Sequence, residues 1–281
     1  MAKMNVYEVV TNQIISHLEK GVIPWKQPWK PGQEAINWFT GKPYRGINKL
    51  LTHPGGEYAT FLQITNAGGK VKKGEKSTPV VFFTTGEKEN EDGEKETYRY
   101  YTVYKVFEIN TQCTGLQSKR VLDESVAELN PIEEAEKLIE GYADRPEIRY
   151  VSGKASYSPS MDLVSVPPMG DYKVLEEYYC TLYHELIHST GSVNRLNREK
   201  GKAFGDEKYS KEELVAEIGA AMLCGLAGIE QATIENSAAY IDSWLKVFRK
   251  DTRMVLTAAR EAQKAVDYMV GKEILEVKYA S

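Results

Sequence analysis

The residues of this sequence with the clearest chemical potential lie between Thr181 and Gly191. Within that stretch, His184, Glu185 and His188 form the pattern H-E-x-x-H. On a helix, side chains four positions apart share a face, so both imidazoles could bind one metal ion. The Glu185 carboxylate would lie beside that ion, where it could take a proton from a bound water molecule. The pattern predicts a hydrolytic metal site; the alternative is two unrelated histidines on a helix surface.

A third protein ligand is expected from a second helix downstream. Ser210 and Glu213 have the spacing of a capping box, which predicts that a helix begins at Ser210. Glu213 and Glu217 are four positions apart and share a face of that helix. We expect Glu213 to be the ligand, because its E-x-x-A-E spacing resembles that of gluzincin metallopeptidases. Glu217 is then either the alternative ligand or a hydrogen-bond partner of a ligand histidine, and Glu212 is expected to be exposed.

The expected cofactor is one divalent metal ion. Two imidazoles and a carboxylate suit zinc, and manganese or another divalent ion is also compatible with these ligands. Tyr157, Tyr209 and Tyr240 are candidate donors to a developing oxyanion. The sequence does not choose among the three tyrosines, and each of them could instead be a packed aromatic residue.

Three cysteines occur in the chain, at Cys113, Cys180 and Cys224. The N-terminal residues show no pattern typical of a secretory signal, and no apolar run reaches the roughly 18–20 residues that span a bilayer. A reduced, cytoplasmic protein without a membrane partner is therefore predicted. Cys180 and Cys224 fall on apolar helical stretches, which favours buried small side chains over metal ligands.

The elements that must position these residues indicate an α+β protein. Helices are expected over residues 6–18, 131–142, 174–190, 210–227 and 232–269, and strands within 75–108, 147–151, 155–168 and 273–280. The acidic stretch 86–96 is expected to form the tip of a hairpin. With 281 residues the chain is long enough for two domains. We predict a mixed α/β domain over 1–120, a linker over 121–135, and a mostly helical domain with a small sheet over 136–281.

The formal net charge of −4 conceals an asymmetry between the two halves. Residues 1–120 contain 17 basic and 12 acidic side chains, whereas residues 121–281 contain 19 basic and 28 acidic ones. In the first half, basic residues alternate with aromatic rings, which suits single-stranded DNA because lysines can follow phosphates and rings can stack on bases. The alternative is that the rings form a core. The candidate DNA-binding residues are Trp25, Lys26, Trp29, Lys30, Trp38, Lys42, Tyr44, Arg45, Lys70, Lys72, Lys73 and Lys76.

Several long motifs are similar to those of the ArdC antirestriction family, in the same order and over nearly the whole chain. In the first half they are I-P-W-K-Q-P-W (23–29), N-W-F-T-G-K-P-Y-R-G-I-N (37–48), T-F-L-Q-I (60–64) and G-G-K-V-K-K-G-E-K (68–76). In the second half they are T-L-Y-H-E-L-I-H-S-T-G (181–191), E-E-L-V-A-E-I-G-A-A (212–221) and A-A-Y-I-D-S-W-L (238–245).

This resemblance implies a single-stranded-DNA-binding domain followed by a zincin-like metallopeptidase domain. It also implies a gene carried on conjugative plasmids or other mobile elements, whose product protects incoming DNA from host restriction. The expected partners are single-stranded DNA and a protein substrate that the sequence does not identify. Two alternatives stay open: a DNA-binding protective protein whose metal site is structural or catalytically silent, and a peptidase whose basic domain recognises protein.

Overall fold

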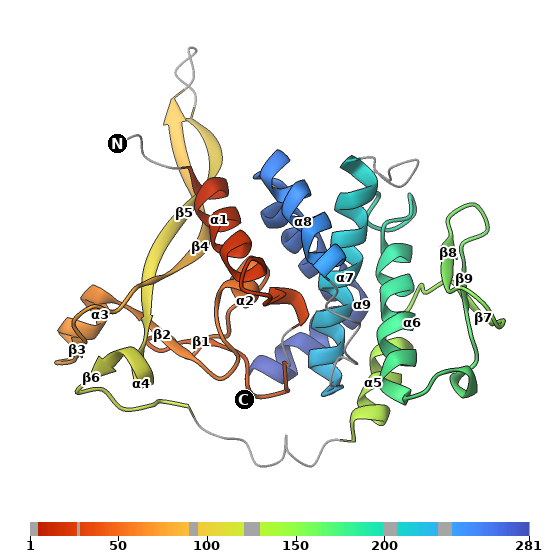
Figure 1. The fold of residues 1–281 in the computed structure, drawn as a ribbon, viewed down its shortest axis with the longest axis horizontal. Helices are drawn as coiled ribbons and strands as arrows, with labels where there is room; N and C mark the ends of the chain where they lie inside the picture. The colour runs from red at the N-terminus through yellow and green to blue at the C-terminus, as the bar shows by residue number, and fades with distance from the viewer. Residues whose placement is uncertain are drawn as a thin grey trace.

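The computed structural model describes residues 5–26, 29–89, 95–120, 130–198, 207–229 and 238–280. It joins an N-terminal region of mixed strands and helices to a C-terminal group of helices that carries a small sheet (Figure 1). This arrangement confirms the expected α+β class. Within those ranges, no helix combines the length and the apolar character needed to cross a membrane.

The N-terminal region is organised around a four-stranded sheet of order β1-β2-β5-β4. Its strands are β1 (Ile36–Asn37), β2 (Glu57–Thr60), β4 (Thr78–Glu89) and β5 (Lys95–Glu108), and a separate pair joins β3 (Lys70–Val71) to β6 (Cys113–Thr114). The helices are α1 (Val6–Leu18), α2 (Ile47–Leu51), α3 (Phe61–Asn66) and α4 (Ile109–Gln112). Helix α1 covers the predicted residues and begins at a capping box formed by Asn5 and Glu8.

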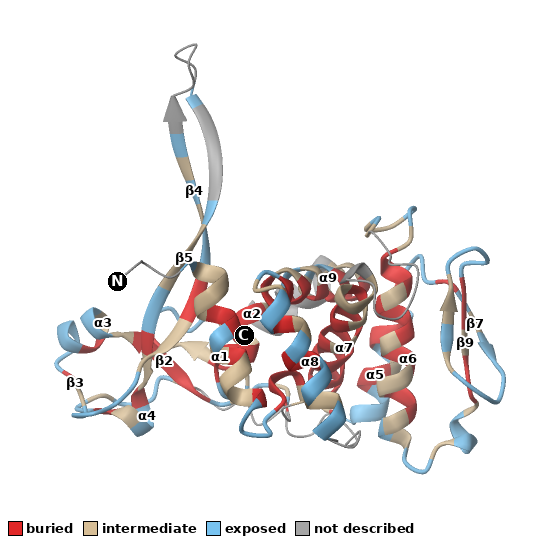
Figure 2. Cartoon of the chain, turned by 45° about the horizontal axis from the view of Figure 1, so that its top comes forward, coloured by how far each residue is buried: buried red, intermediate tan, exposed pale blue. Residues whose placement is uncertain are grey.

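Strands β4 and β5 form a long antiparallel hairpin that extends away from the rest of the molecule (Figure 1). At its base, where Thr78 pairs with Val106, the neighbouring Val80 and Val81 are buried. From Phe82 onward the described side chains are mostly exposed or half-buried (Figure 2). The paired strands agree with the predicted hairpin; residues 90–94 of its acidic stretch lie outside the described residues.

In its described residues the C-terminal region has five helices and a small sheet. The helices are α5 (Pro131–Glu140), α6 (Leu175–Thr190), α7 (Glu207–Ala227), α8 (Ala238–Lys250) and α9 (Met254–Ala280). The sheet has the order β7-β9-β8, with β7 (Glu147–Tyr150) parallel to β9 (Leu163–Val166) and β8 (Ser156–Ser158) antiparallel to β9. It lies beside α6 at the edge of the molecule (Figure 1). Two short 3-10 helices, η1 (Pro24–Lys26) and η3 (Met169–Asp171), complete the described elements.

Three predicted elements differ from the structure. Helix α7 is already helical at Glu207, so Ser210 lies inside the helix and does not cap it. The single helix expected over 232–269 is divided between α8 and α9 by residues 251–253, and its first residues, 232–237, lie outside the described residues. Residues 273–280, predicted as a strand, instead continue α9 beyond a kink at Gly271, and they join none of the three described sheets.

One hydrophobic core is shared by the two regions. Val10 of α1, Trp25 of η1 and Leu50 of α2 belong to the same buried cluster as residues of α6, α7 and α9. Smaller clusters around Tyr58 and Trp38 lie within the N-terminal region. Separating the halves would therefore expose apolar surface to water. The domain limits 1–120 and 136–281 stay a prediction, and residues 121–129 of the expected linker lie outside the described residues.

Candidate metal centre

Helix α6 presents two histidines on one side while its other side packs into the core. Leu182, Leu186 and Ile187 are fully buried, which fixes the rotation of the helix. His184 and His188 then point to the same side, and their Nε2 atoms lie 3.1 Å apart. The two side chains keep partial exposure, so a small ion could reach their ring nitrogens.

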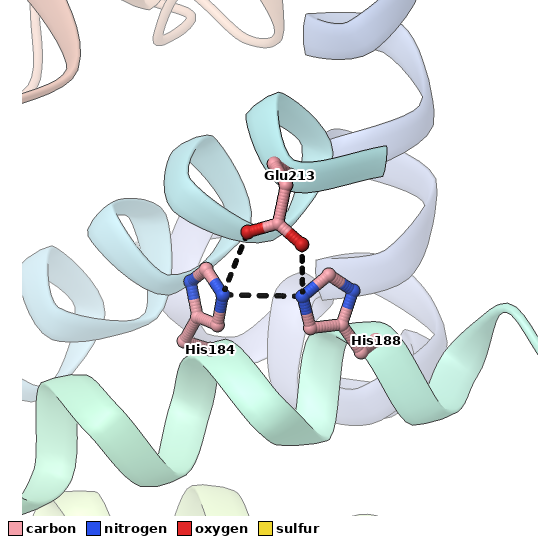
Figure 3. Close-up of side chains that lie close together, drawn as sticks. All are labelled: His184, His188 and Glu213. Carbon is pink, nitrogen blue, oxygen red and sulfur yellow. Dashed lines mark hydrogen bonds and ion pairs between the residues drawn. The ribbon is translucent and has the colours of Figure 1, made fainter. Parts of the chain in front are cut away.

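Helix α7 brings a carboxylate to these two nitrogens, as Figure 3 shows. The Oε2 atom of Glu213 lies 3.6 Å from Nε2 of His184, and its Oε1 atom lies 3.5 Å from Nε2 of His188. The donor atoms of the three residues all lie within 4.8 Å of one another. Two imidazole nitrogens and one carboxylate oxygen form a donor set that fits a divalent ion such as zinc and leaves room for a water molecule.

Glu212, which the sequence predicted to be exposed, is buried beneath this cluster. Only 7% of the residue is accessible, and its Oε1 atom lies 3.3 Å from Nδ1 of His188. The Arg198 guanidinium donates to both Glu212 oxygens, at 3.0 and 2.7 Å. Burial alone would raise the pKa of Glu212, but the hydrogen bonds from Arg198 and His188 lower it to about 2. A charged carboxylate therefore supports the ring of His188, the geometry that orients a metal-binding histidine.

Arg198 also binds the C-terminal end of α6. Its guanidinium donates to the Thr190 hydroxyl at 2.7 Å and to the Ile187 carbonyl at 2.8 Å. Gly191 ends the helix at this point, and a Cβ on it would lie 2.9 Å from Nη2 of Arg198. The close approach of the guanidinium thus accounts for glycine at this position.

Glu217 lies one turn beyond Glu213 and has partners of its own. Its carboxylate accepts a hydrogen bond from Trp25 Nε1 at 2.8 Å and one from the Tyr240 hydroxyl. The Lys26 ammonium lies 4.2 Å from the centroid of the Tyr240 ring. Burial raises the pKa of Glu217 above its ordinary value. Glu217 therefore connects η1, α7 and α8, and it stands outside the cluster of three donors.

Glu185 and Tyr209 lie close to the donor cluster. Glu185 is buried. Burial alone would lower the pKa of His184, but the hydrogen bond that His184 donates to the Glu213 carboxylate and the charge of Glu185 outweigh that effect and raise it. The Tyr209 hydroxyl is hydrogen-bonded to Glu213, and burial together with the charge of Glu213 raises the pKa of Tyr209. Tyr157, by contrast, donates to Asp162. Of the three candidate tyrosines, Tyr209 alone is hydrogen-bonded to a residue of the donor cluster among the described contacts.

The aromatic residues predicted to bind DNA lie in the core. Trp25, Trp29, Trp38 and Tyr44 are between 1% and 7% exposed. Trp29 packs so closely on α7 that a Cβ on Gly225 would lie 2.7 Å from the Trp29 Cβ atom. Stacking on bases requires an open ring face, which these four rings do not have in this structure. Their position agrees with the alternative prediction, in which the aromatic rings form a core.

The predicted basic residues are mostly on the surface. Lys30, Lys42, Lys70, Lys72, Lys73 and Lys76 are exposed, whereas Lys26 is half-buried. Exposed Arg45 forms an ion pair with Asp267 of α9. The exposed rings of the N-terminal region belong to other positions, namely Phe39, Phe61, Phe82, Phe83, Tyr100 and Tyr104. Phe39 and Phe61 belong to the aromatic residues that alternate with cations in the sequence, but composition does not tell which side of an element is covered.

Two family models match consecutive parts of the chain. A model of the N-terminal domain of the anti-restriction factor ArdC matches residues 4–107, and a model of zincin-like metallopeptidases matches residues 133–261. The chain is also similar to the crystal structure of the antirestriction ArdC protein from plasmid R388 in its metal-free form, with 33% identity, a TM-score of 0.73, and coverage of 95% of this chain and 97% of that one. For the Mn(II)-bound form the identity is 32% and the TM-score 0.74, with the same coverage.

Curated relatives show the same likeness. The uncharacterized protein y4eC of Sinorhizobium fredii (strain NBRC 101917 / NGR234) is 31% identical over 94% of this chain and 91% of its own length. Two DNA primase TraC proteins of Escherichia coli are 32% and 31% identical over 98% of this chain. The chain spans only 20% and 28% of the lengths of these two primases.

Proposed function

This chain belongs to the ArdC antirestriction family, and from that premise we propose that it binds single-stranded DNA with its N-terminal region and cleaves a protein substrate at its metal centre. The observation that carries the peptidase assignment is the cluster of His184, His188 and Glu213 beside the buried Glu185. We propose zinc as the ion, with manganese as the alternative that the Mn(II)-bound relative supports. The proposed setting is the cytoplasm of a cell that receives plasmid DNA.

In this proposal the three donor side chains hold the ion, which supplies Lewis acidity and lowers the pKa of a bound water molecule to roughly 7. The Glu185 carboxylate accepts the proton of the attacking water and returns it to the amine that leaves. The Tyr209 hydroxyl is the proposed oxyanion donor, because it is hydrogen-bonded to Glu213 of the donor cluster. Glu212 and Arg198 keep the His188 ring in its orientation.

The peptidase proposal is tested with the Glu185→Gln variant of the full-length protein. We expect the variant to bind metal as the wild type does, measured by elemental analysis, and to cleave a quenched fluorescent peptide library about 100- to 10,000-fold more slowly. Glu176→Gln is the matched control, because Glu176 is exposed in the first turn of the same helix. If wild type and Glu185→Gln both cleave nothing but both protect plasmid DNA, the metal site is catalytically silent and the alternative function holds.

The DNA proposal rests on the match to the ArdC N-terminal domain and on the surface of that region. Exposed lysines lie in β3, at Lys70, and between β3 and β4, at Lys72, Lys73 and Lys76. The hairpin adds a cluster of exposed rings: Phe82 and Tyr104 lie edge to face with centroids 5.5 Å apart, and Tyr100 follows on the same face of β5. Open rings and exposed cations in the same region provide what a single strand requires, namely stacking on bases and neutralisation of phosphates.

A fluorescent oligothymidylate tests the DNA proposal by anisotropy, with the full-length protein. We expect binding that weakens as salt increases, with a slope of log K against log salt of about −0.7 for each phosphate neutralised. A duplex of the same length is expected to bind less tightly, because its bases are already stacked. Equal binding to both forms, or no binding at low salt, would contradict the assignment and favour a basic region that recognises protein.

A further inference from the structure

Two cysteines meet at the contact between the helices that carry the candidate metal ligands. Cys180 lies on α6, one turn before His184, and Cys224 lies on α7, three turns after Glu213. Their sulfur atoms are 3.1 Å apart. The third cysteine, Cys113, belongs to a separate cluster in the N-terminal region. All three are thiols in this structure.

We propose that Cys180 and Cys224 are a thiol-oxidation site that closes into a disulfide between α6 and α7. The reaction needs a two-electron acceptor, and a small disulfide such as oxidised glutathione is the chemical class we assign. The Cys180 thiolate attacks one sulfur of the oxidant and displaces one thiolate. Cys224 then loses its proton and displaces the second thiolate from Cys180. Two thiols are oxidised to one disulfide, and the oxidant is reduced to two thiols.

The order of these steps follows from accessibility. Cys180 is half-buried and can meet an oxidant from solvent, whereas Cys224 is fully buried. A buried thiol is a poor first nucleophile but an efficient second one when its partner is already in contact. A disulfide bond measures about 2.05 Å, so the two sulfur atoms must approach by roughly 1 Å. Rotation of the two side chains can supply that change while the helices stay packed.

The proposed disulfide would join the two helices that carry the candidate metal ligands. Helices α6 and α7 supply the two histidines and the glutamate of the donor cluster. A covalent bond between them would restrict the unfolded chain and hold the two helices together at the same contact. This inference does not depend on the proposed peptidase activity, because it concerns the thiols and the stability of the protein.

Thiol titration of the full-length protein tests the proposal. The reduced protein has three cysteines to titrate, and after treatment with oxidised glutathione we expect one, which peptide mapping should identify as Cys113. The intact mass should fall by two hydrogen atoms, without an added glutathione. The oxidised protein should melt about 5 °C or more above the reduced one.

Variants distinguish the proposed pair from other thiol chemistry. Cys113→Ser should still form the bond and lose both remaining thiols, whereas Cys180→Ser should keep both of its thiols under the same oxidant. Three thiols remaining in the wild type, a stable glutathione adduct on Cys180, or a bond that includes Cys113 would each overturn the proposal. The peptide map of the wild type decides the matter even if a variant folds poorly.

Discussion

Two regions of the molecule depart in opposite ways from the rule that charged side chains are exposed and aromatic ones buried. One is the contact between helices α6 and α7, and the other is the β4–β5 hairpin. The helix contact buries the carboxylates Glu185 and Glu212, although acidic side chains are rarely buried without partners. The hairpin exposes Phe82, Tyr100 and Tyr104, although large rings usually lie in the core. Figure 2 shows the contrast between the buried helices and the exposed hairpin. In both places the departure marks the residues with a proposed function.

The two regions differ in how they hold those residues. At the helix contact, the Glu212 carboxylate is held by Arg198 and His188, which come from other segments of the chain. The rings of the hairpin are held by two strands and by each other. A substitution at the helix contact should therefore disturb a network, whereas one on the hairpin should remove a surface and little else.

The largest expected effect concerns Trp25, which links the N-terminal region to the helix contact. Trp25→Ala should lower the free energy of unfolding by about 4 kcal/mol, because it removes a fully buried ring and one of the donors to Glu217. Urea unfolding measures this change. Phe39→Ala, at an exposed aromatic position of the same region, should change it by no more than about 0.5 kcal/mol.

A different result would revise the comparison of the two regions. If Trp25→Ala unfolds like the wild type but binds oligothymidylate much more weakly, Trp25 acts on the surface and not in the core. The same measurement on Phe39→Ala separates a loss of DNA affinity from a loss of stability.

The second effect tests the burial of a ring that the sequence predicted to contact DNA. Burial raises the pKa of Tyr44 to about 12 from an ordinary value of 10.0. The folded state thus favours the protonated phenol of Tyr44. The stability that this preference contributes is complete below pH 10 and is lost as the pH rises to 12. Between these limits the wild type should lose about 3 kcal/mol more than Tyr44→Phe. Unfolding curves at several pH values measure the difference, and parallel curves for the two proteins would show a ring exposed to solvent.

These expectations show what the sequence could and could not reveal. The spacing of His184 and His188, and the placement of Glu213 on a second helix, depend on helix geometry that is local to a few residues. The support of His188 by Glu212 depends on Arg198, which lies in a loop after α6, and no periodicity reports such a contact. Glu212 was predicted to be exposed because its own helix gives no sign of that arginine.

The aromatic residues of the first half illustrate the opposite limit. Their composition suited both a DNA surface and a core, and nothing local decides between the two. The structure decides it through distant contacts: Trp25 meets Tyr240, and Trp29 meets Gly225. The hairpin strands were predictable from their β-branched and aromatic residues, but the exposed face of Phe82 depends on which side the rest of the chain covers.

The third effect concerns the buried partner of His188. Glu212→Gln should weaken metal binding about 10- to 100-fold. A neutral amide accepts a weaker hydrogen bond from Nδ1 of His188 than a carboxylate does, so it orients the ring less firmly and makes Nε2 a weaker metal ligand. Competition with a chromophoric chelator measures the affinity, on protein whose fold is verified by circular dichroism. The control Glu176→Gln keeps the same change of charge on the surface of α6 and should bind as the wild type does. Equal metal affinities for the wild type, Glu212→Gln and Glu176→Gln would mean that Glu212 pairs with Arg198 without supporting the metal site.

The smallest expected effect is the loss of one ring from the hairpin. Phe82→Ala should weaken binding of oligothymidylate about tenfold, because stacking contributes roughly 1–3 kcal/mol for each base. Tyr150→Ala is the matched control, since Tyr150 is also an exposed ring, on the sheet of the C-terminal region. The salt dependence should stay the same in Phe82→Ala, because no cation is removed. A weaker affinity accompanied by a smaller salt slope would mean that the substitution also changes how the lysines of the N-terminal region contact phosphates. An unchanged affinity would place the single strand on another face of that region.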